Sequence, residues 1–333
     1  MKNSHFASKS VIAMTSFVMV FLCTSVTWSQ KSKSKGGEEA TTRKKKNNDK
    51  ADKKDKEKKE EEDKKGFWER VAGKEVKASD ESRNKVLQSL RLSTQVKNEE
   101  KKKKLIQKAI SEARKGIKAN PEALDLNYWL GYALYMLQRY KESLVYLQKA
   151  KKLDKESKYL AEIAFKEGII YTFLGKSSKA YKAYKEALQS PVQNVDSVGV
   201  IYANAAECLM TMGKISDAIS TYEKSLAVKP IKNSQALWGL AVALDRDEQI
   251  IKAAQAAKAA AKLDPKLQTI QGPGVFFVPQ GEVHYYLGLA YEALGKPKKA
   301  LKHWKSFIKK LPESPWKYRA QDHVKKLSGS DKR

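Results

Sequence analysis

The sequence predicts an all-α protein in which about five helix hairpins stack side by side. The first observation is a pattern of 34 residues that recurs five times between Leu124 and Ser314. The second is that atypical, more polar helical segments flank these copies, as expected for the ends of a stacked array. The third is a charged stretch before them that holds almost no apolar residues and has nothing with which to build a core.

The copies over residues 199–232 and 281–314 agree at every marked position. Each has a small residue at position 8, Gly at the turn, Ala early in the second helix, an aromatic at position 24 and Pro near the end. The marks are Ala206, Gly213, Ala218, Tyr222 and Pro230 in one copy, and Gly288, Gly295, Ala300, Trp304 and Pro312 in the other. A small residue lets two helices approach closely, and a bulky one fills the space between them.

The other three copies keep most of these marks. Residues 161–194 have Gly168, Gly175 and Tyr184 at the same spacing. Residues 234–267 have Glu248 where the turn Gly is expected, and residues 124–157 have Ser143 in place of the Ala. Five copies in register argue against an unrelated helical bundle, because accidental periodicity would not keep the same spacing in every copy.

These residues resemble the tetratricopeptide repeat (TPR) family, and the resemblance covers most of the chain after residue 120. It implies a right-handed α-solenoid that binds protein partners without catalysis. The predicted organisation is as follows: 1–29 signal peptide, 30–66 charged tether, 67–120 helical cap and degenerate repeat, repeats at 124–157, 161–194, 199–232, 234–267 and 281–314, an insertion at 268–280, and a cap helix at 315–328.

The N-terminus has the features of a secretory signal. Lys2 and Lys9 precede an apolar run over residues 11–23, and a cut after Ser29 fits the pattern. We therefore expect export to the periplasm or cell envelope. An uncleaved membrane anchor over residues 11–28 is the alternative, because that stretch is about long enough to cross a bilayer. The Lys-rich sequence that follows argues against export, since positive charge favours the cytoplasmic side.

From Lys31 to Gly66 the Lys and Arg residues outnumber Asp and Glu fifteen to ten, and Ala40 and Ala51 are the only apolar residues. This composition predicts a disordered, solvated tether. The alternative is a basic tail that binds an anionic polymer or membrane surface, which the formal net charge of +28 allows. Cys208 is the only cysteine after the apolar run, so removal of the signal would leave no intramolecular disulfide.

The two ends of the array are predicted to be capped by helices. Apolar residues recur at helical spacing between residues 86 and 117, and Asn120 with Pro121 ends that segment. At the other end, Ser314 and Pro315 suit the start of a helix whose apolar stripe includes Trp316 and Ala320.

The resemblance also implies which positions of the first helices line a concave groove. In this chain those positions, together with the insertion, supply the candidate partner-binding residues: Tyr128, Tyr132, Tyr135, Phe165, Phe173, Glu207, Trp238, Asp245, Phe276, Phe277, Tyr285 and Glu292. An alternative for Phe165 and Trp238 is that their rings pack between repeats. An alternative for Phe276 and Phe277 is that they fold back and fill a gap, instead of forming an exposed contact loop.

Rings and carboxylates at these positions favour a peptide or protein partner that carries Lys or Arg beside apolar residues. The TPR clamp for acidic chaperone tails needs Lys and Asn at groove positions, whereas Tyr128 and Tyr132 stand there. That class of partner is disfavoured. Lysines on the second helices, such as Lys182 and Lys305, predict a basic convex face that could contact an anionic surface.

The sequence offers no catalytic arrangement, so we expect no enzyme, no cofactor and no small-molecule substrate. His284, His303 and His323 lack the spacing of a metal site. No nucleic-acid module with interleaved base-stacking aromatics is present, and no specific nucleic acid is expected.

Overall fold

The computed structural model describes residues 73–74, 76–191, 195–228, 233–272 and 277–330. The predicted signal peptide at 1–29, the alternative anchor at 11–28 and the tether at 30–66 lie outside the described residues. So does Phe276. All regular structure in the described ranges is helical.

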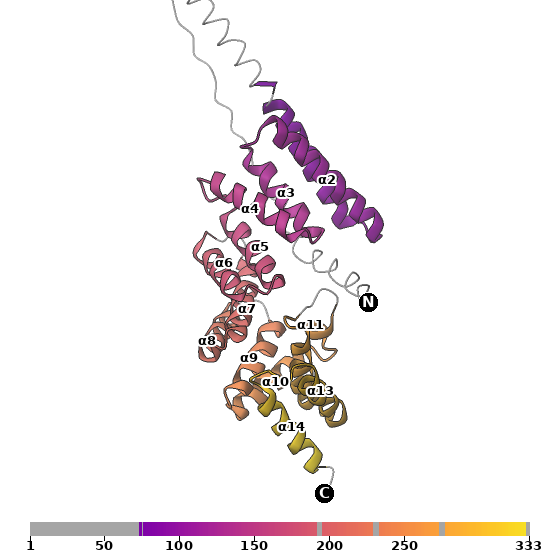
Figure 1. Cartoon of the computed structure of the whole chain (residues 1–333), viewed down its shortest axis with the longest axis vertical. Coiled ribbons are helices and arrows are strands. Elements are labelled where there is room, and N and C mark those ends of the chain that lie inside the picture. The colour runs from indigo at the N-terminus through magenta and orange to yellow at the C-terminus, as the bar shows by residue number, and fades with distance from the viewer. Residues whose placement is uncertain (1–72, 75, 192–194, 229–232, 273–276, 331–333) are drawn as a thin grey trace, which may run out of the picture.

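The helices follow one another as antiparallel pairs that stack along the long axis of the molecule (Figure 1). This arrangement confirms the predicted all-α solenoid. The five pairs are α3 (Leu124–Met136) with α4 (Tyr140–Leu153), α5 (Leu160–Phe173) with α6 (Ser177–Gln189), α7 (Val195–Thr211) with α8 (Ile215–Ala227), α9 (Ser234–Arg246) with α10 (Ile250–Leu263), and α12 (Val283–Ala293) with α13 (Pro297–Lys310).

A further helix pair precedes the repeats, and one helix follows them. The helix over residues 76–95 and α2 (Glu99–Ala119) bury Val86, Leu90 and Ile106 in a cluster shared with α3. At the other end α14 (Lys317–Ser330) packs against α13. It begins two residues after Pro315, because Ser314 and the two residues after it form a turn in which Ser314 Oγ accepts the Trp316 N–H at 3.3 Å.

Within a repeat, the bulky residue at position 24 lies directly against the small residue at position 8. A Cβ on Gly168 would lie 2.4 Å from Cε1 of Tyr184, and one on Gly288 would lie 2.5 Å from Cε2 of Trp304. Tyr184 and Trp304 are both buried. The close approach that the sequence pattern predicts is therefore made by these pairs, and it leaves no room for even one methyl group.

The turn between the two helices has the same conformation in all five repeats. Its position 15 has positive φ at Gly175, Gly213 and Gly295, at +67°, +73° and +65°. Gln138 and Glu248 take the same conformation, at +59° and +58°, without being Gly. In each repeat the N–H of the next residue bonds to the carbonyl five residues earlier, as Lys176 N to Tyr171 O at 2.8 Å does, which caps the first helix.

The insertion adds the short helix α11 (Gln268–Gln271) and the 3₁₀ turn η2 (Gln280–Glu282) between α10 and α12. Phe277 turns inward, with its ring centroid 5.0 Å from that of Tyr286. The Phe277 ring therefore packs against α12 and stays half-buried.

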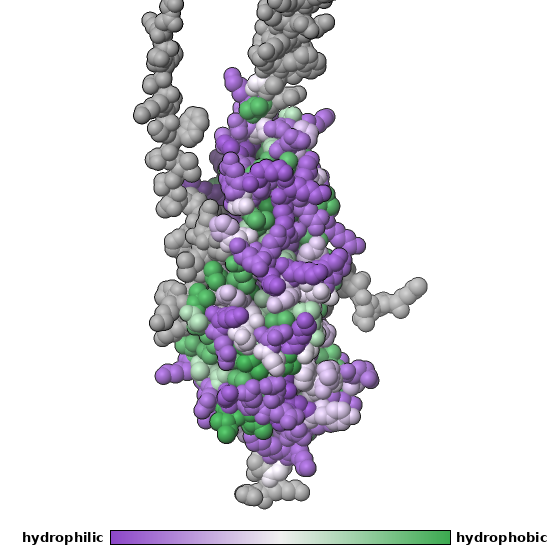
Figure 2. Space-filling view, turned by 90° about the vertical axis from the view of Figure 1, so that its left-hand side faces the viewer, coloured by the Kyte–Doolittle hydropathy of each residue, from purple (hydrophilic) through white to green (hydrophobic). Residues whose placement is uncertain are grey.

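Hydrophilic residues cover much of the face seen in Figure 2, and apolar residues gather in its lower half.

We expect Gly168→Ala to lower the free energy of unfolding by about 2 to 3 kcal/mol, because overpacking against Tyr184 outweighs the better helix propensity of Ala. Gly213→Ala has open space around its new Cβ and should cost only about 1 kcal/mol, from its positive φ alone. Gly329→Ala serves as the control, because Gly329 lies in α14 with open space where its Cβ would be. This change should not destabilise the protein. Urea unfolding of the three variants measures these differences, and a Gly168→Ala variant as stable as the control would contradict the packing argument.

Candidate functional site

A groove with a cavity volume of about 660 Å³ runs along the first helices of the repeats. Residues of α3, α5, α7, α9 and α12 line it, together with Phe277 to Pro279 of the insertion and residues 310–316, from the last residue of α13 to the residue before α14. One element from each repeat thus contributes to a single surface. The volume lies in the range of ligand-binding clefts.

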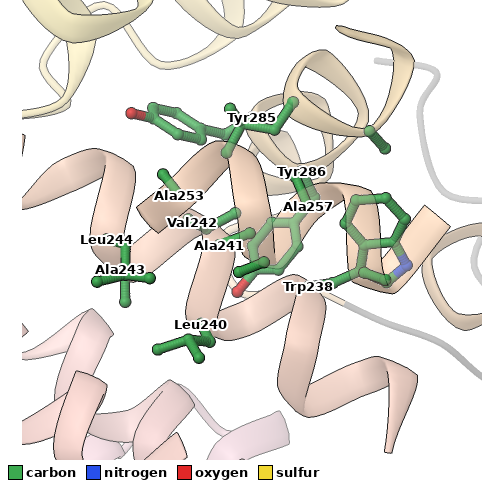
Figure 3. Close-up of a cluster of buried hydrophobic side chains, with 14 of the residues drawn as sticks. Trp238, Leu240, Ala241, Val242, Ala243, Leu244, Ala253, Ala257, Tyr285 and Tyr286 are labelled. Atoms are coloured by element: carbon green, nitrogen blue, oxygen red, sulfur yellow. The ribbon is translucent and has the colours of Figure 1, made fainter. Parts of the chain in front are cut away.

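Six of the twelve candidate residues line this groove. They are Tyr132, Tyr135, Phe165, Glu207, Trp238 and Phe277. Tyr135, Phe165 and Phe277 keep part of their surface exposed, whereas Tyr132 and Trp238 are buried. The Trp238 indole N–H donates to Asp264 at 3.3 Å, so this ring is hydrogen-bonded within its own repeat. Figure 3 shows it beside Tyr286, among the apolar residues of α9 and α10.

Tyr128 and Tyr285 do not line the groove. Tyr128 is 1% exposed, stacks on Tyr159 with a centroid distance of 4.2 Å, and donates its hydroxyl to Glu162. Tyr285 is fully buried and donates to Asp245 at 2.7 Å. These rings hold neighbouring repeats together, because each hydroxyl reaches a carboxylate of the repeat beside its own.

Asp245 also lies away from the groove. Its carboxylate accepts a hydrogen bond from Arg319 Nη2 at 2.7 Å and lies 3.1 Å from His323 Nε2. Arg319 and His323 both belong to α14. Burial would raise the pKa of Asp245, but hydrogen bonds and charge from His323, with Arg319 and Tyr285, lower it to about 2. The cap helix covers a position that repeat periodicity alone would leave open to a partner.

Glu292 belongs to the same network. It accepts the indole N–H of Trp304 at 2.6 Å, and its Oε1 lies 2.7 Å from His323 Nδ1, a charge contact outside hydrogen-bond geometry. Phe173 is the remaining described candidate. It stacks on Tyr140 of the preceding repeat at 4.9 Å and does not line the groove.

Carboxylates at the predicted groove positions are already bonded within the protein. Glu207 accepts the hydroxyls of Tyr222, at 2.6 Å, and of Tyr286. Burial raises the pKa of Glu207 and outweighs these hydrogen bonds. Glu282 forms an ion pair with Arg246. The predicted acidic groove is therefore not a row of carboxylates free to bind basic side chains.

Two buried cations that were not among the candidates do line the groove, Lys166 on α5 and Arg246 on α9. Lys166 is the only basic residue of α5 and stands among apolar residues, which is the one sequence feature that could have identified it. The Arg246 guanidinium lies between the rings of Tyr285 and Trp316, at 4.5 and 5.1 Å from their centroids.

Comparisons with protein families find the tetratricopeptide repeat. One model of that repeat matches residues 281–314, and a second matches residues 105–157 and 204–267. A comparison with curated proteins finds no match.

Several solved structures are similar. YrrB, described as "a TPR protein with an unusual peptide-binding site", is 17% identical with a TM-score of 0.42, over 63% of this chain and 97% of that one. PilF of Pseudomonas aeruginosa is 16% identical with a TM-score of 0.48, over 74% and 98% of the two chains. PilW, described as a type IV pilus biogenesis factor, is 16% identical with a TM-score of 0.46, over 73% and 97%.

The attachment of α14 should depend on pH through His323. Burial would lower the pKa of His323, but hydrogen bonding to Asp245 and the charges of Asp245 and Glu292 raise it to about 8. A raised pKa means that protonated His323 stabilises the fold fully below about pH 6.5 and loses this contribution as pH rises through 8. We expect a loss of about 2 kcal/mol in the free energy of unfolding between pH 6.5 and 9.

Urea unfolding across this pH range measures the loss. His323→Gln should be less stable at pH 6.5 and should lack this alkaline decrease. His303→Gln serves as the matched control, because His303 lies outside the Asp245 network and its pKa is lowered. An unchanged alkaline slope in His323→Gln would exclude His323 as its source.

Proposed function

The chain belongs to the tetratricopeptide repeat family, and on that premise we propose that it is a non-catalytic scaffold whose groove binds a peptide segment of a partner protein. The observation that carries this proposal is the continuity of the groove. Five repeats, the insertion and the turn before α14 line one surface. A peptide lying along it would contact several repeats at once, which is how a stacked array accumulates binding energy from modest single contacts.

The groove is suited to apolar and aromatic parts of a partner. Tyr135, Phe165 and Phe277 are half-buried and offer ring surface to the cavity. Rigid rings provide contact area at low entropic cost, since their neighbours already fix their orientation. Tyr135, for example, is held between the rings of Tyr132 and Tyr140, each 6.3 Å away.

We further propose that the scaffold works at the cell envelope. The support is the signal-like sequence over residues 1–29. In the described ranges no helix has the length and apolar character to cross a bilayer. N-terminal sequencing of the purified protein would test export, since cleavage after Ser29 leaves Gln30 as the first residue, whereas an intact apolar segment would indicate an anchor.

Groove binding predicts that Tyr135→Ala combined with Phe165→Ala weakens partner capture at least about tenfold, since truncating an interface anchor typically costs 1 kcal/mol or more. Affinity pull-down from the source organism, followed by quantification of the captured protein, measures this. Tyr318→Ala is the matched control, because Tyr318 is 76% exposed on α14 and lies outside the groove. Capture that is equal in the double variant and the control would rule out the groove.

A second candidate function is contact with an anionic polymer or membrane surface. The exposed lysines of α13 favour it: Lys298, Lys299, Lys302, Lys305, Lys309 and Lys310. Charge-driven binding of this kind weakens steeply between low and physiological salt. Groove capture should change little over the same range, so a salt series in the pull-down separates the two functions.

A further inference from the structure

Lys166 is an unusual residue for the wall of an apolar groove. Its side chain is 7% exposed, and its Nζ lies 4.6 Å from the ring centroid of Tyr132 and 5.5 Å from that of Tyr135. In the described ranges it forms no ion pair with a carboxylate. Buried cations in proteins are normally paired with an anion, because removing a charge from water is costly.

The groups around Lys166 compensate its charge only in part. Burial lowers the pKa of Lys166, and the charge of Glu162, one turn earlier on α5, opposes that change. The Glu162 carboxylate itself accepts the hydroxyl of Tyr128. Burial raises the pKa of Tyr132 and Tyr135, so both rings are neutral at physiological pH and supply only their π faces.

The second buried cation of the groove has an unsatisfied donor. Arg246 is 8% exposed, and its Nε is buried without a hydrogen-bond partner among the described residues. Its Nη2 is paired with Glu282. Both buried cations of the groove can therefore still bind a negatively charged group, whereas its partly buried carboxylates, Glu207 and Glu282, are already bonded. A partner group that complements these cations is negatively charged.

We propose that Lys166, between Tyr132 and Tyr135, forms a subsite for the side-chain carboxylate of an internal Asp or Glu of the bound peptide, next to an aromatic or apolar residue. This inference rests on the proposed function and names the chemistry of its partner. It reverses the charge that the sequence pattern predicted for that partner.

Tyr132 and Tyr135 of α3 belong to the subsite itself, and the residues from α7 to α12 extend the groove beyond it. We assign the carboxylate to a side chain, because a neighbouring residue can then contact the tyrosine rings while the peptide continues along the groove. The ammonium would form a charge-assisted hydrogen bond with the carboxylate while the neighbouring side chain covers the tyrosine rings.

The test compares the binding of three N-acetylated tripeptides to the full-length chain: acetyl-Phe-Glu-Phe-amide, acetyl-Phe-Gln-Phe-amide and acetyl-Phe-Gln-Phe with a free C-terminal carboxylate. Titration followed by NMR gives the three affinities. We expect the Glu peptide to bind at least about tenfold more tightly than its Gln isostere. Lys166→Met, which keeps the length of the side chain, should abolish this preference. Lys182→Met removes the same charge from an exposed position on α6 and should retain it.

Three results would overturn the subsite: equal affinity for the Glu and Gln peptides, a preference that survives in Lys166→Met, or no binding of the Glu peptide at millimolar concentration. If the Gln peptide with the free C-terminal carboxylate bound more tightly than its amide while the Glu amide did not, the assignment of the subsite to an internal side chain would be overturned. The pull-down with the Tyr135 and Phe165 double variant tests the groove without regard to the charge of the peptide, so groove-dependent capture without a carboxylate preference would refute the subsite and leave the scaffold function standing.

Thermal unfolding gives a second measurement. Replacing an unpaired buried cation by Met should leave the unfolding midpoint unchanged or raise it, because a binding residue is retained at a cost to stability. A midpoint lowered by several degrees in Lys166→Met would show that the cation–π contacts hold α3 to α5, and it would assign Lys166 a structural role instead.

Discussion

The architecture depends on a contact that recurs in the repeats at 124–157, 161–194 and 281–314, in which a bulky side chain of the second helix closes over a glycine of the first. The Gly168 and Tyr184 pair sets the separation of its two helices to within a methyl group. Tyr222 extends the same contact to the next repeat, since a Cβ on Gly239 would lie 2.3 Å from its ring, and its hydroxyl also reaches Glu207 in the groove. One ring therefore fixes the pairing of helices, the stacking of repeats and part of the groove wall.

Features set by local geometry could be predicted from the sequence. The small and bulky marks and the turn position recur at fixed spacing, so helix pairing and the location of each turn follow from them. Glu248 shows the strength of this constraint, because it adopts the positive φ of the turn although it is not Gly. Here the capping hydrogen bonds and the packing of the flanking helices outweigh a strain of about 1 kcal/mol.

The roles of single side chains at the groove could not be predicted in the same way, because they depend on contacts between distant segments. Asp245 and Glu292 occupy groove positions by periodicity, yet α14 covers them through Arg319 and His323, more than seventy residues after Asp245. Tyr128 and Tyr285 turn away from the groove because a carboxylate of the neighbouring repeat accepts their hydroxyls. Lys166 was missed for a different reason: its importance comes from the lack of a direct ion pair with a carboxylate, and a repeat pattern does not show which side chains remain unpaired.

The end of the groove and the cap helix are physically linked through two consecutive residues of α9. Asp245 points to α14 and holds Arg319 and His323, whereas Arg246 lines the groove and stacks on Trp316, just before α14 begins. Undocking α14 would leave the buried Asp245 without its cationic partners and would remove one of the two rings that hold Arg246. Leaving one member of a buried charge network unpaired costs several kcal/mol, so the cap and this end of the groove should open and close together. A partner that packs against Trp316 would then stabilise the docked cap, and by the same coupling the docked cap would favour binding of such a partner.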